Sequence, residues 1–477
     1  MGLKFNNCKL TDLAAESTCR FDVKFIQNLN RISNGHYNYK HLFEIVDYSK
    51  IKPESLPESF EYVEIGNVDK NGVVEPHRLS FDDRNELNEA LFKKIEKGDI
   101  IKPAVGNILI SCIRPYLNKT ILIEDEGRYF TKAFIQIKPL IDPKILFYCL
   151  RGIYLSDINS VSRQGKGYPT LKDFDLKTVR FSKSKIDTLL SNHKVLVKNI
   201  VSIENEIKEL SRKRQSDKAI INRVFSNHFN IALKELQSID NKKSINLSIG
   251  DVGFRNHNFR QSYRWFKLEV IQKYLYNNIG CIRRLGDFII STNNGWSPQS
   301  EDDLDGTPVM GQEHICHNGS LKIAPTKSTL KTKKGIENFY IRTGNFFVSR
   351  GNTIDLVALA SVIDEAVNDD IIYPDLYIKV DFNEFVDKKY IALLFNSFFG
   401  RFYFKYASKG KNQTMVKISA DELYNFYLPL PDIGTQTEIV EMISQEIEKC
   451  SEIDQEIFNK RRMIFELIDN YIELDTP

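Results

Sequence analysis

The 477-residue sequence predicts an α+β protein made of two tandem, pseudo-repeated mixed α/β domains, each followed by a long helix. Two observations lead to this prediction. The chain contains an internal repeat with a period of about half its length, and an apolar heptad seam lies behind each copy. The length agrees, because a single hydrophobic core stops growing at roughly 250–300 residues and longer chains divide into domains.

The repeat consists of five pairs of matching segments that occur in the same order in both halves. The pairs are residues 20–27 and 264–272, 62–68 and 308–314, 106–111 and 344–350, 120–123 and 357–363, and the glycine-lysine loops 163–168 and 408–413. The second pair precedes Asn-Gly dipeptides at 71–72 and 318–319, which indicate hairpin turns. Each half also carries an apolar-periodic segment, which predicts helices at 143–155 and 388–404.

Behind each predicted domain, apolar residues are spaced alternately three and four apart, from Ile186 to Leu210 and from Ile443 to Tyr471. About 25 residues of such a helix span roughly 37 Å. We expect the two helices to pair with each other as a coiled coil; the alternative is that each packs only on its own domain. The predicted boundaries are domain 1 at 1–183, spacer helix 1 at 184–228, a polar linker at 229–250, domain 2 at 251–433 and spacer helix 2 at 434–477.

The net charge of +3 does not by itself indicate a nucleic-acid partner, so the position of the charge decides. Basic residues gather with tyrosines and glycines in segments 160–185 and 400–417. Flexible basic loops with amide side chains suit phosphate contact and the reading of base edges; a solvated basic face is the alternative. The candidate DNA-binding residues are Arg163, Gln164, Lys166, Tyr168, Arg350, Lys409, Lys411, Asn412 and Gln413.

Signatures of catalysis are missing from the sequence. It has no Asn/Asp-Pro-Pro-aromatic tetrapeptide of an amino-methyltransferase and no G-x-x-x-x-G-K-[ST] phosphate loop. The clearest E-x-K triplet, residues 206–208, falls inside the first heptad helix, where it forms a helix-surface pair. His314, Cys316 and His317 resemble a fragment of a zinc site but lack a second ligand pair, so we interpret them as turn and core residues and expect no metal.

Cysteine usage and hydropathy predict a cytoplasmic protein. The seven cysteines are scattered without a C-x-x-C pair, which indicates reduced thiols. No apolar run is long enough to cross a bilayer, and the N-terminus lacks a signal-peptide core, so we expect no membrane partner.

The architecture resembles the specificity subunits of Type I restriction-modification enzymes, in which two target-recognition domains are each followed by a helix. The most specific local match is Leu428-Pro429-Leu430-Pro431, followed by Gln436 and Ile439, which is similar to that family's proline-rich junction with a glutamine just inside the helix. The loop at 410–413 and Ile418-Ser419 also resemble the family pattern. The first junction, residues 179–183, carries no proline and lacks the glutamine, so the two junctions need not bind partners in the same way.

This resemblance implies a chain without catalysis that reads a bipartite DNA target, with one half-site for each domain. The helices would pair in antiparallel and set the gap, since half-sites one helical turn apart are separated by about 34–36 Å. Methyltransferase subunits and a restriction/translocase subunit would dock on the chain, and S-adenosylmethionine, Mg²⁺ and ATP would bind to those partners. The candidate docking residues on the helices are Ile200, Ile203, Ile207, Leu210, Ile443, Ile447, Ile457 and Ile464.

Three other interpretations stay open at this point. The chain could be the specificity subunit of a related two-subunit Type II system, which neighbouring genes would distinguish. It could be a coiled-coil adaptor without DNA contact, which would explain the helices but not the matched basic loops. An enzyme of unfamiliar chemistry is the third, and the missing signatures disfavour it.

Overall fold

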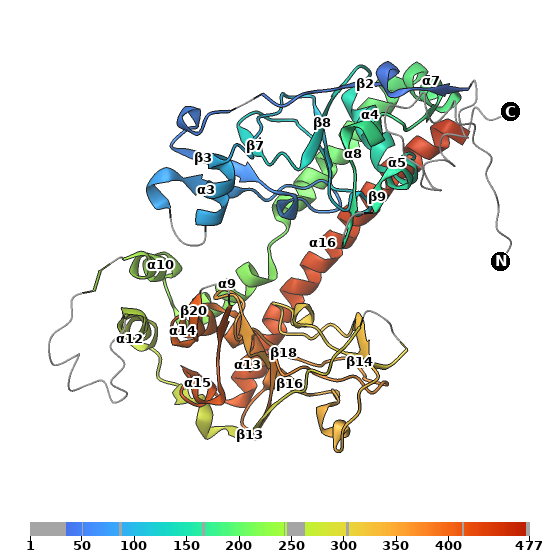
Figure 1. Cartoon of the computed structure of the whole chain (residues 1–477). Coiled ribbons are helices and arrows are strands. Elements are labelled where there is room, and N and C mark those ends of the chain that lie inside the picture. Colours follow the sequence, from blue (N-terminus) through green and yellow to red (C-terminus); the bar gives the residue numbers. More distant parts are fainter. Residues whose placement is uncertain are drawn as a thin grey trace. The chain divides into compact units, whose positions relative to one another are not determined.

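The computed structural model describes residues 35–49, 51–84, 88–164, 167–242, 244–245, 263–301, 305–412 and 415–473. The chain divides into two compact units, and each contains both helices and sheets (Figure 1). Unit 1 comprises residues 1–210 and 456–477, and unit 2 comprises residues 211–455. The last helix, α16 (Ile433–Glu473), therefore belongs to unit 2 up to Gln455 and to unit 1 beyond it.

Unit 1 is a mixed body of short strands and helices. Its strands are β1 (His36–Tyr37), β2 (Phe43–Ile45), β3 (Ser59–Val63), β4 (His77–Ser80), β5 (Ile108–Ser111), β6 (Thr120–Leu122), β7 (Arg128–Phe130), β8 (Phe134–Pro139), β9 (Arg163–Gln164), β10 (Pro169–Thr170) and β11 (Phe181–Ser182). Its helices are α3 (Glu89–Glu96), α4 (Pro143–Arg151), α5 (Leu155–Val161), α6 (Asp173–Leu176), α7 (Lys183–Ser191) and α8 (His193–Lys213), of which α8 ends just beyond the unit boundary.

The largest sheet of unit 1 has the order β2-β8-β5-β6, and all neighbouring strands are antiparallel. A second sheet places β3 between antiparallel β4 and parallel β7. Strand β5 is buried along its whole length, so its apolar residues form a continuous run rather than an alternating one. The main core joins this sheet to α4, to Leu196 and Ile200 of α8, and to Ile464 and Ile468 of α16.

Unit 2 has the same kinds of element. Its strands are β12 (Ile282–Arg284), β13 (Ile289–Asn294), β14 (Thr307–Val309), β15 (Lys327–Thr329), β16 (Phe346–Ser349), β17 (Gly351–Asn352), β18 (Ala360–Val362), β19 (Tyr377–Phe382), β20 (Lys409–Asn412), β21 (Met415–Lys417) and β22 (Tyr427–Pro429). Its helices, besides the first part of α16, are α9 (Asp217–Phe229), α10 (Leu233–Asn241), α12 (Tyr263–Tyr276), α13 (Lys388–Asn396), α14 (Phe398–Ala407) and α15 (Ala420–Tyr424).

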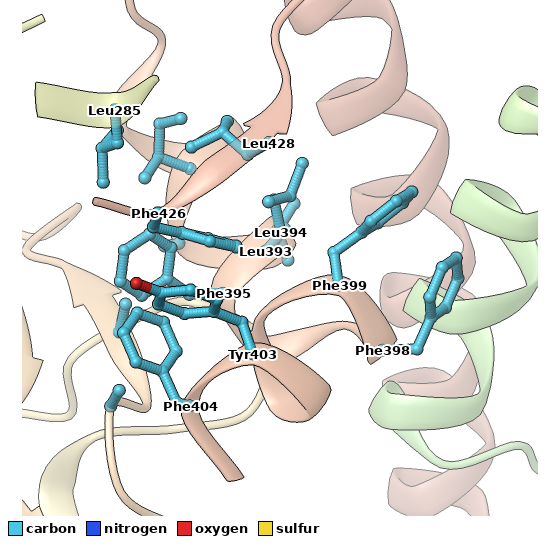
Figure 2. Packing of buried hydrophobic residues seen from close by; sticks show 14 of the residues in the cluster. Leu285, Leu393, Leu394, Phe395, Phe398, Phe399, Tyr403, Phe404, Phe426 and Leu428 are labelled. Atoms are coloured by element: carbon cyan, nitrogen blue, oxygen red, sulfur yellow. The ribbon is translucent and has the colours of Figure 1, made fainter. Parts of the chain in front are cut away.

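The largest sheet of unit 2 has the order β13-β19-β16-β18, again with antiparallel neighbours. The core against it is rich in aromatic rings from α13, α14 and the segment before β22. Figure 2 shows Phe395, Phe404 and Phe426 in this cluster; the Phe395 and Phe404 ring centroids are 5.0 Å apart. Tyr403 stacks on Phe426 at 4.6 Å. Tilted and stacked ring contacts of this kind add to the stability that burial supplies.

The two helices predicted at 143–155 and 388–404 are each divided in two, which corrects the sequence prediction. Helix α4 ends before Gly152, where a Cβ atom would lie 2.8 Å from Phe465 Cδ1, and α5 begins after a short turn. Helix α13 ends before Ser397, whose hydroxyl accepts from Phe399 N and caps α14. The apolar period continues across both breaks, so periodicity alone does not detect them.

The first predicted spacer helix, 184–228, contains three helices, α7, α8 and α9. Ser216 begins α9, because its hydroxyl accepts from Ala219 N at 3.2 Å and replaces a missing helical partner. The second predicted spacer, 434–477, corresponds to α16, and residues 474–477 lie outside the described part. Helix α10 falls within the predicted linker at 229–250.

Both predicted Asn-Gly turns are present. Val68 pairs antiparallel with Val74 around the first, and Ile315 with Leu321 around the second. Gly72 and Gly319 have φ of 78° and 75°, a backbone conformation that favours glycine. Of the first pair of repeat segments, residues 264–272 lie in α12, whereas residues 20–27 fall outside the described residues.

In the described ranges, the model contains no helix that is both long enough and apolar enough to cross a membrane.

Candidate nucleic-acid interface

The first glycine-lysine loop forms a short hairpin in which β9 pairs with β10. Arg163 begins this hairpin, and its guanidinium points back into unit 1. Its Nε lies 3.0 and 2.9 Å from the two carboxylate oxygens of Asp175, whose side chain is 0% exposed. The guanidinium also lies over the ring of Phe174, 4.2 Å from its centroid. Asp175 in turn accepts from Lys172 N at 3.2 Å and so caps α6.

The rest of this hairpin holds the other candidates of the first half. Tyr168 is 41% exposed, and the guanidinium of Arg114 lies over its ring, 5.5 Å from the centroid. Gln164 lies in β9, whereas Lys166 lies outside the described residues. Tyr168 thus presents an aromatic ring with a cation beside it, which suits stacking and phosphate contact. Arg114 was not predicted, because no local pattern connects it to the hairpin.

The second glycine-lysine loop forms the hairpin of β20 and β21, which β17 extends to a three-stranded sheet. Lys409 begins it, and its Nζ lies 2.7 Å from Oε1 of Glu422, a side chain that is 8% exposed. Glu422 also accepts from Ser419 N at 2.9 Å and caps α15. Burial alone would raise the pKa of Glu422, but the hydrogen bonds from Lys409 and Ser419 hold this pKa below its ordinary value.

Arg350 lies at the edge of the same sheet. Its carbonyl accepts from Ile418 N at 2.8 Å, its own amide donates to the Leu376 carbonyl at 2.7 Å, and its side chain is half-buried. The structure thus brings Arg350 and the second hairpin together. Lys411 and Asn412 lie in β20, and Gln413 lies outside the described residues.

Two carboxylates, Asp175 and Glu422, are the main residues that sequence reasoning missed. Each stands three residues after the N-cap of a short helix, at the capping-box position. The Ser419-x-x-Glu422 spacing was a readable signal in the second half. In the first half Lys172 replaces the usual small polar residue, so only the comparison with the second copy would have identified Asp175.

Not all basic residues of the two segments are available to a ligand. Arg401 donates to the carbonyls of Phe395 and Val357 at 3.0 and 2.7 Å, and burial lowers its pKa to about 10. Lys405 forms an ion pair with Asp240 at 2.8 Å. These two cations stabilise the packing of α14 within unit 2, so the charge that faces solvent is smaller than the sequence suggests.

The helix residues predicted to dock partners lie largely in the cores. Ile200 and Ile443 are 0% exposed, Ile464 is 1% and Ile457 is 7%. Ile203, Ile207, Leu210 and Ile447 are partly buried. The heptad seam is therefore covered, wholly or in part, from within each unit.

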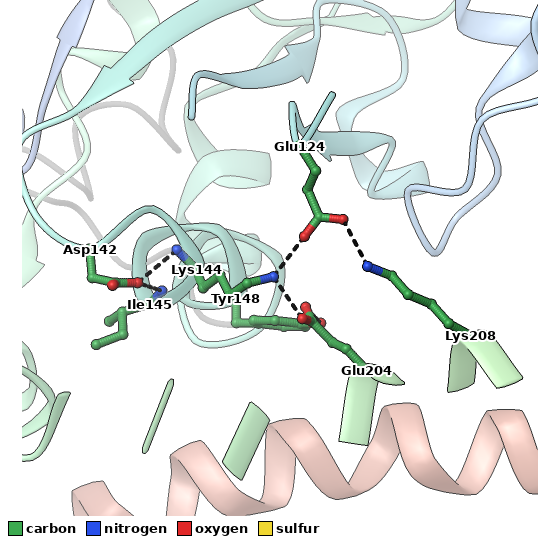
Figure 3. A network of polar contacts seen from close by, with 7 residues as sticks. All are labelled: Glu124, Asp142, Lys144, Ile145, Tyr148, Glu204 and Lys208. Atoms are coloured by element: carbon green, nitrogen blue, oxygen red, sulfur yellow. Dashed lines mark hydrogen bonds and ion pairs between the residues drawn. The ribbon is translucent and has the colours of Figure 1, made fainter. Parts of the chain in front are cut away.

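A polar network joins α8 to α4 and to the segment after β6 in unit 1 (Figure 3). Lys144 Nζ lies 2.7 Å from Glu124 and 2.6 Å from Glu204, and Tyr148 donates to Glu204 at 2.9 Å. Lys208 reaches the second oxygen of Glu124 at 3.5 Å. Burial alone would lower the pKa of Lys144, but the two glutamates raise it, so the amine is held charged. The E-x-K triplet at 206–208 makes no pair of its own, since Glu206 contacts Lys460 at 2.6 Å.

Among the described residues, no group of three or more His, Cys, Asp or Glu side chains could hold a metal ion. His314 is buried at the end of a 3-10 helix (Gln312–His314), and burial lowers its pKa.

Comparison with known proteins gives one family. Residues 281–460 match the model described as the Type I restriction modification DNA specificity domain. No curated protein matches the chain. The HsdS subunit from Thermoanaerobacter tengcongensis is 14% identical, with 93% of this chain and 98% of that chain covered and a TM-score of 0.31. The Type I restriction-modification S subunit from M. genitalium is 13% identical, with 92% and 96% covered and a TM-score of 0.36. A structure titled for complex assembly and conformational transition of the type I R-M system is 14% identical, with 93% and 98% covered and a TM-score of 0.36.

Proposed function

We propose that the whole chain is the DNA-specificity subunit of a restriction-modification system, because residues 281–460 match the model of the Type I restriction modification DNA specificity domain. The resemblance inferred from sequence is thereby confirmed for these residues. In the proposal, units 1 and 2 each read one half of a bipartite target, and the chain itself supplies no catalysis. The match of residues 281–460 is the observation that carries the proposal, because it covers the second hairpin and the first part of α16.

A second recognition domain in unit 1 is supported by matching strand order. The sheets β2-β8-β5-β6 and β13-β19-β16-β18 follow the same antiparallel plan in chain order. An equivalent hydrogen bond also occurs beside the sheet in each unit. Gly106 N donates to the Ile123 carbonyl at 2.8 Å, and Gly344 N donates to the Ile363 carbonyl at 2.8 Å. If only the C-terminal half of the chain were a recognition domain, unit 1 would not need to share these features with unit 2.

The ends of helices α4 and α13 provide further support for duplication. Arg151, the last residue of α4, donates from Nη2 to the carbonyl of Lys70 at 2.8 Å, just before Asn71. Asn396, the last residue of α13, donates to the carbonyl of His317 at 3.0 Å. Both side chains hold the backbone of the Asn-Gly turn in their own unit. Different residue types thus make an equivalent contact, which is expected of two copies that have diverged in sequence.

Antiparallel pairing of the spacer helices is supported by the order of their ion pairs. In unit 1, Glu206 pairs with Lys460. In unit 2, Arg214 pairs with Asp454 at 3.1 Å, and Arg223 pairs with Glu446. From one ion pair to the next, the residue number in the segment 206–223 rises while the residue number in α16 falls. We infer that α8 and α9 run antiparallel to α16 and that their length sets the gap between half-sites.

Methyltransferase and restriction/translocase subunits are the proposed protein partners, and S-adenosylmethionine, Mg²⁺ and ATP would bind to them. The test maps methylated bases genome-wide in cells with the gene present and with it deleted. We expect one bipartite methylated motif to vanish on deletion, and an unchanged methylome would refute the proposal. Exchanging unit 1's residues 1–183 alone should change one half of the motif. Copurification with separate methyltransferase and translocase subunits, rather than one fused nuclease-methyltransferase, distinguishes Type I from the Type II alternative.

A further inference from the structure

The cations that begin the two hairpins are each paired with a carboxylate that the fold buries, although the side chain of Lys409 is itself 60% exposed. Arg163 reaches both oxygens of Asp175, and Lys409 reaches Glu422. For Arg163, contact with phosphate would break an ion pair whose carboxylate is 0% exposed. Breaking a buried ion pair costs more than one surface phosphate contact returns, so the Arg163–Asp175 pair persists when DNA binds.

The same construction occurs in both units with different residue types. In each unit a hairpin begins with a cation, a short helix follows, and the acid at the capping position of that helix accepts from both the cation and the N-cap amide. Unit 1 pairs the guanidinium of an arginine with an aspartate. Unit 2 pairs the amine of a lysine with a glutamate, whose side chain is longer. The carboxylate thus joins the base of the hairpin to a helix that is itself packed on the domain.

We propose that Asp175 and Glu422 are positioning residues for DNA reading. Arg163 does not contact DNA; it holds the base of its hairpin against a buried carboxylate, so that Tyr168 meets the duplex in a defined orientation. Lys409 holds the base of the second hairpin in the same way but keeps an exposed side chain. The inference rests on the proposed function, since it assigns roles within the same two hairpins. It revises the expectation that Arg163 is itself a phosphate contact.

The test measures binding of the chain, in complex with its methyltransferase subunits, to a synthetic duplex that carries the motif found by methylation mapping. Asp175→Asn keeps an oxygen for the helix cap but removes the charge partner of Arg163. Positioning predicts a loss of affinity of about tenfold, the usual effect of losing one charge-assisted hydrogen bond. If Arg163 instead contacts phosphate, removing a nearby negative charge frees the cation, and affinity rises. The sign of the change therefore decides between the two roles.

Asp173→Asn is the matched control, because Asp173 lies on the same short helix, is 53% exposed and pairs only weakly with Lys177 at 3.9 Å. It makes the same charge change without touching the hairpin, so affinity should stay within about twofold of the wild type. Asp421→Asn serves the same purpose beside Glu422→Gln in the second unit. A second duplex with one half-site scrambled shows which half each variant affects; Asp175→Asn should lower discrimination at one half-site and Glu422→Gln at the other.

The salt dependence of DNA binding is a measurement that a change in fold stability alone would not alter. Arg163→Gln should weaken binding without changing the slope of log Kd against log salt, and the double variant with Asp175→Asn should bind no worse than either single variant. A slope reduced by about 0.9, or tighter binding by Asp175→Asn, would overturn the inference. If Asp175→Asn does not fold, Arg163→Gln alone decides through its slope. A wild-type complex that shows no preference for the mapped motif would refute the proposed function instead.

Discussion

Asn396 provides a direct test of how the recognition fold of unit 2 is held together. Its side chain is 1% exposed and makes hydrogen bonds both to strand β18 and to the Asn-Gly turn before Leu321. Its oxygen accepts from Ala360 N at 2.9 Å, and its amide donates to the carbonyls of Ala360 at 2.8 Å, His317 at 3.0 Å and Cys316 at 3.3 Å. The substitution Asn396→Ala removes all four bonds and leaves the buried Ala360 amide without its side-chain partner.

The magnitude follows from these contacts. The two N–H groups and the oxygen of the side chain contribute roughly 1 kcal/mol each, and an unpaired buried amide costs about 1–3 kcal/mol more, so we expect a loss of about 4–6 kcal/mol in the free energy of unfolding. For a unit of this size, each kcal/mol lowers the melting temperature by about 2–4 °C, which gives a decrease of roughly 8–24 °C.

The assay is thermal unfolding followed by circular dichroism, combined with hydrogen exchange at the Ala360 amide. This amide should lose its protection in the variant. Asn293→Ala is the control, because Asn293 is exposed in β13 and its loss should change stability by less than about 0.5 kcal/mol. A melting temperature within 2 °C of the wild type (roughly the shift for 1 kcal/mol), with Ala360 still protected, would show that the Asn396 contacts do not hold the turn to the sheet.

Further predictions concern packing, pH and DNA binding. Gly152→Leu should lower the melting temperature of unit 1, because even a Cβ atom would lie 2.8 Å from Phe465 Cδ1 and overpacking costs about 1–3 kcal/mol; calorimetry checks this, and an unchanged melting temperature contradicts it. The pKa of Glu422 is lowered in the fold, so its contribution to stability is present above its ordinary pKa of 4.5 and is lost as pH falls through the lower folded value. Glu422→Gln should therefore reduce the dependence of the unfolding free energy on pH in this acidic range. Urea titrations at a series of pH values measure this dependence. Lys411→Ala should reduce the salt slope of DNA binding by about 0.9 if Lys411 contacts a phosphate, and an unaltered slope would exclude that contact.

Several features of the fold were predictable because they depend on a few neighbouring residues. The Asn-Gly turns before Val74 and Leu321 form as expected, since glycine tolerates the positive φ that the turn requires. The beginnings of α4 and α13 were also readable: Asp142 and Asp387 accept from the first amides of the two helices. Such signals act through the local backbone and do not depend on the rest of the fold.

The same local signals could not show which candidates face a ligand. The sequence placed Arg163 and Lys409 in flexible basic loops, and that description left both free to contact phosphate. Whether a cation meets solvent or a carboxylate depends on how the following short helix packs on its domain. That packing brings Asp175 and Glu422 under the two hairpins.

The sequence by itself predicted a duplicated chain with a heptad-patterned helix behind each half, and it determined that residues 281–460 match a DNA specificity family, because periodicity and motifs are properties of the chain alone. The tertiary structure decided where helices break and which apolar residues are covered. Position 152 accommodates only glycine because Phe465, distant in sequence, occupies the space of a side chain. Ile200 and Ile464 share one core for the same reason: contacts between distant segments exist only after the chain has folded.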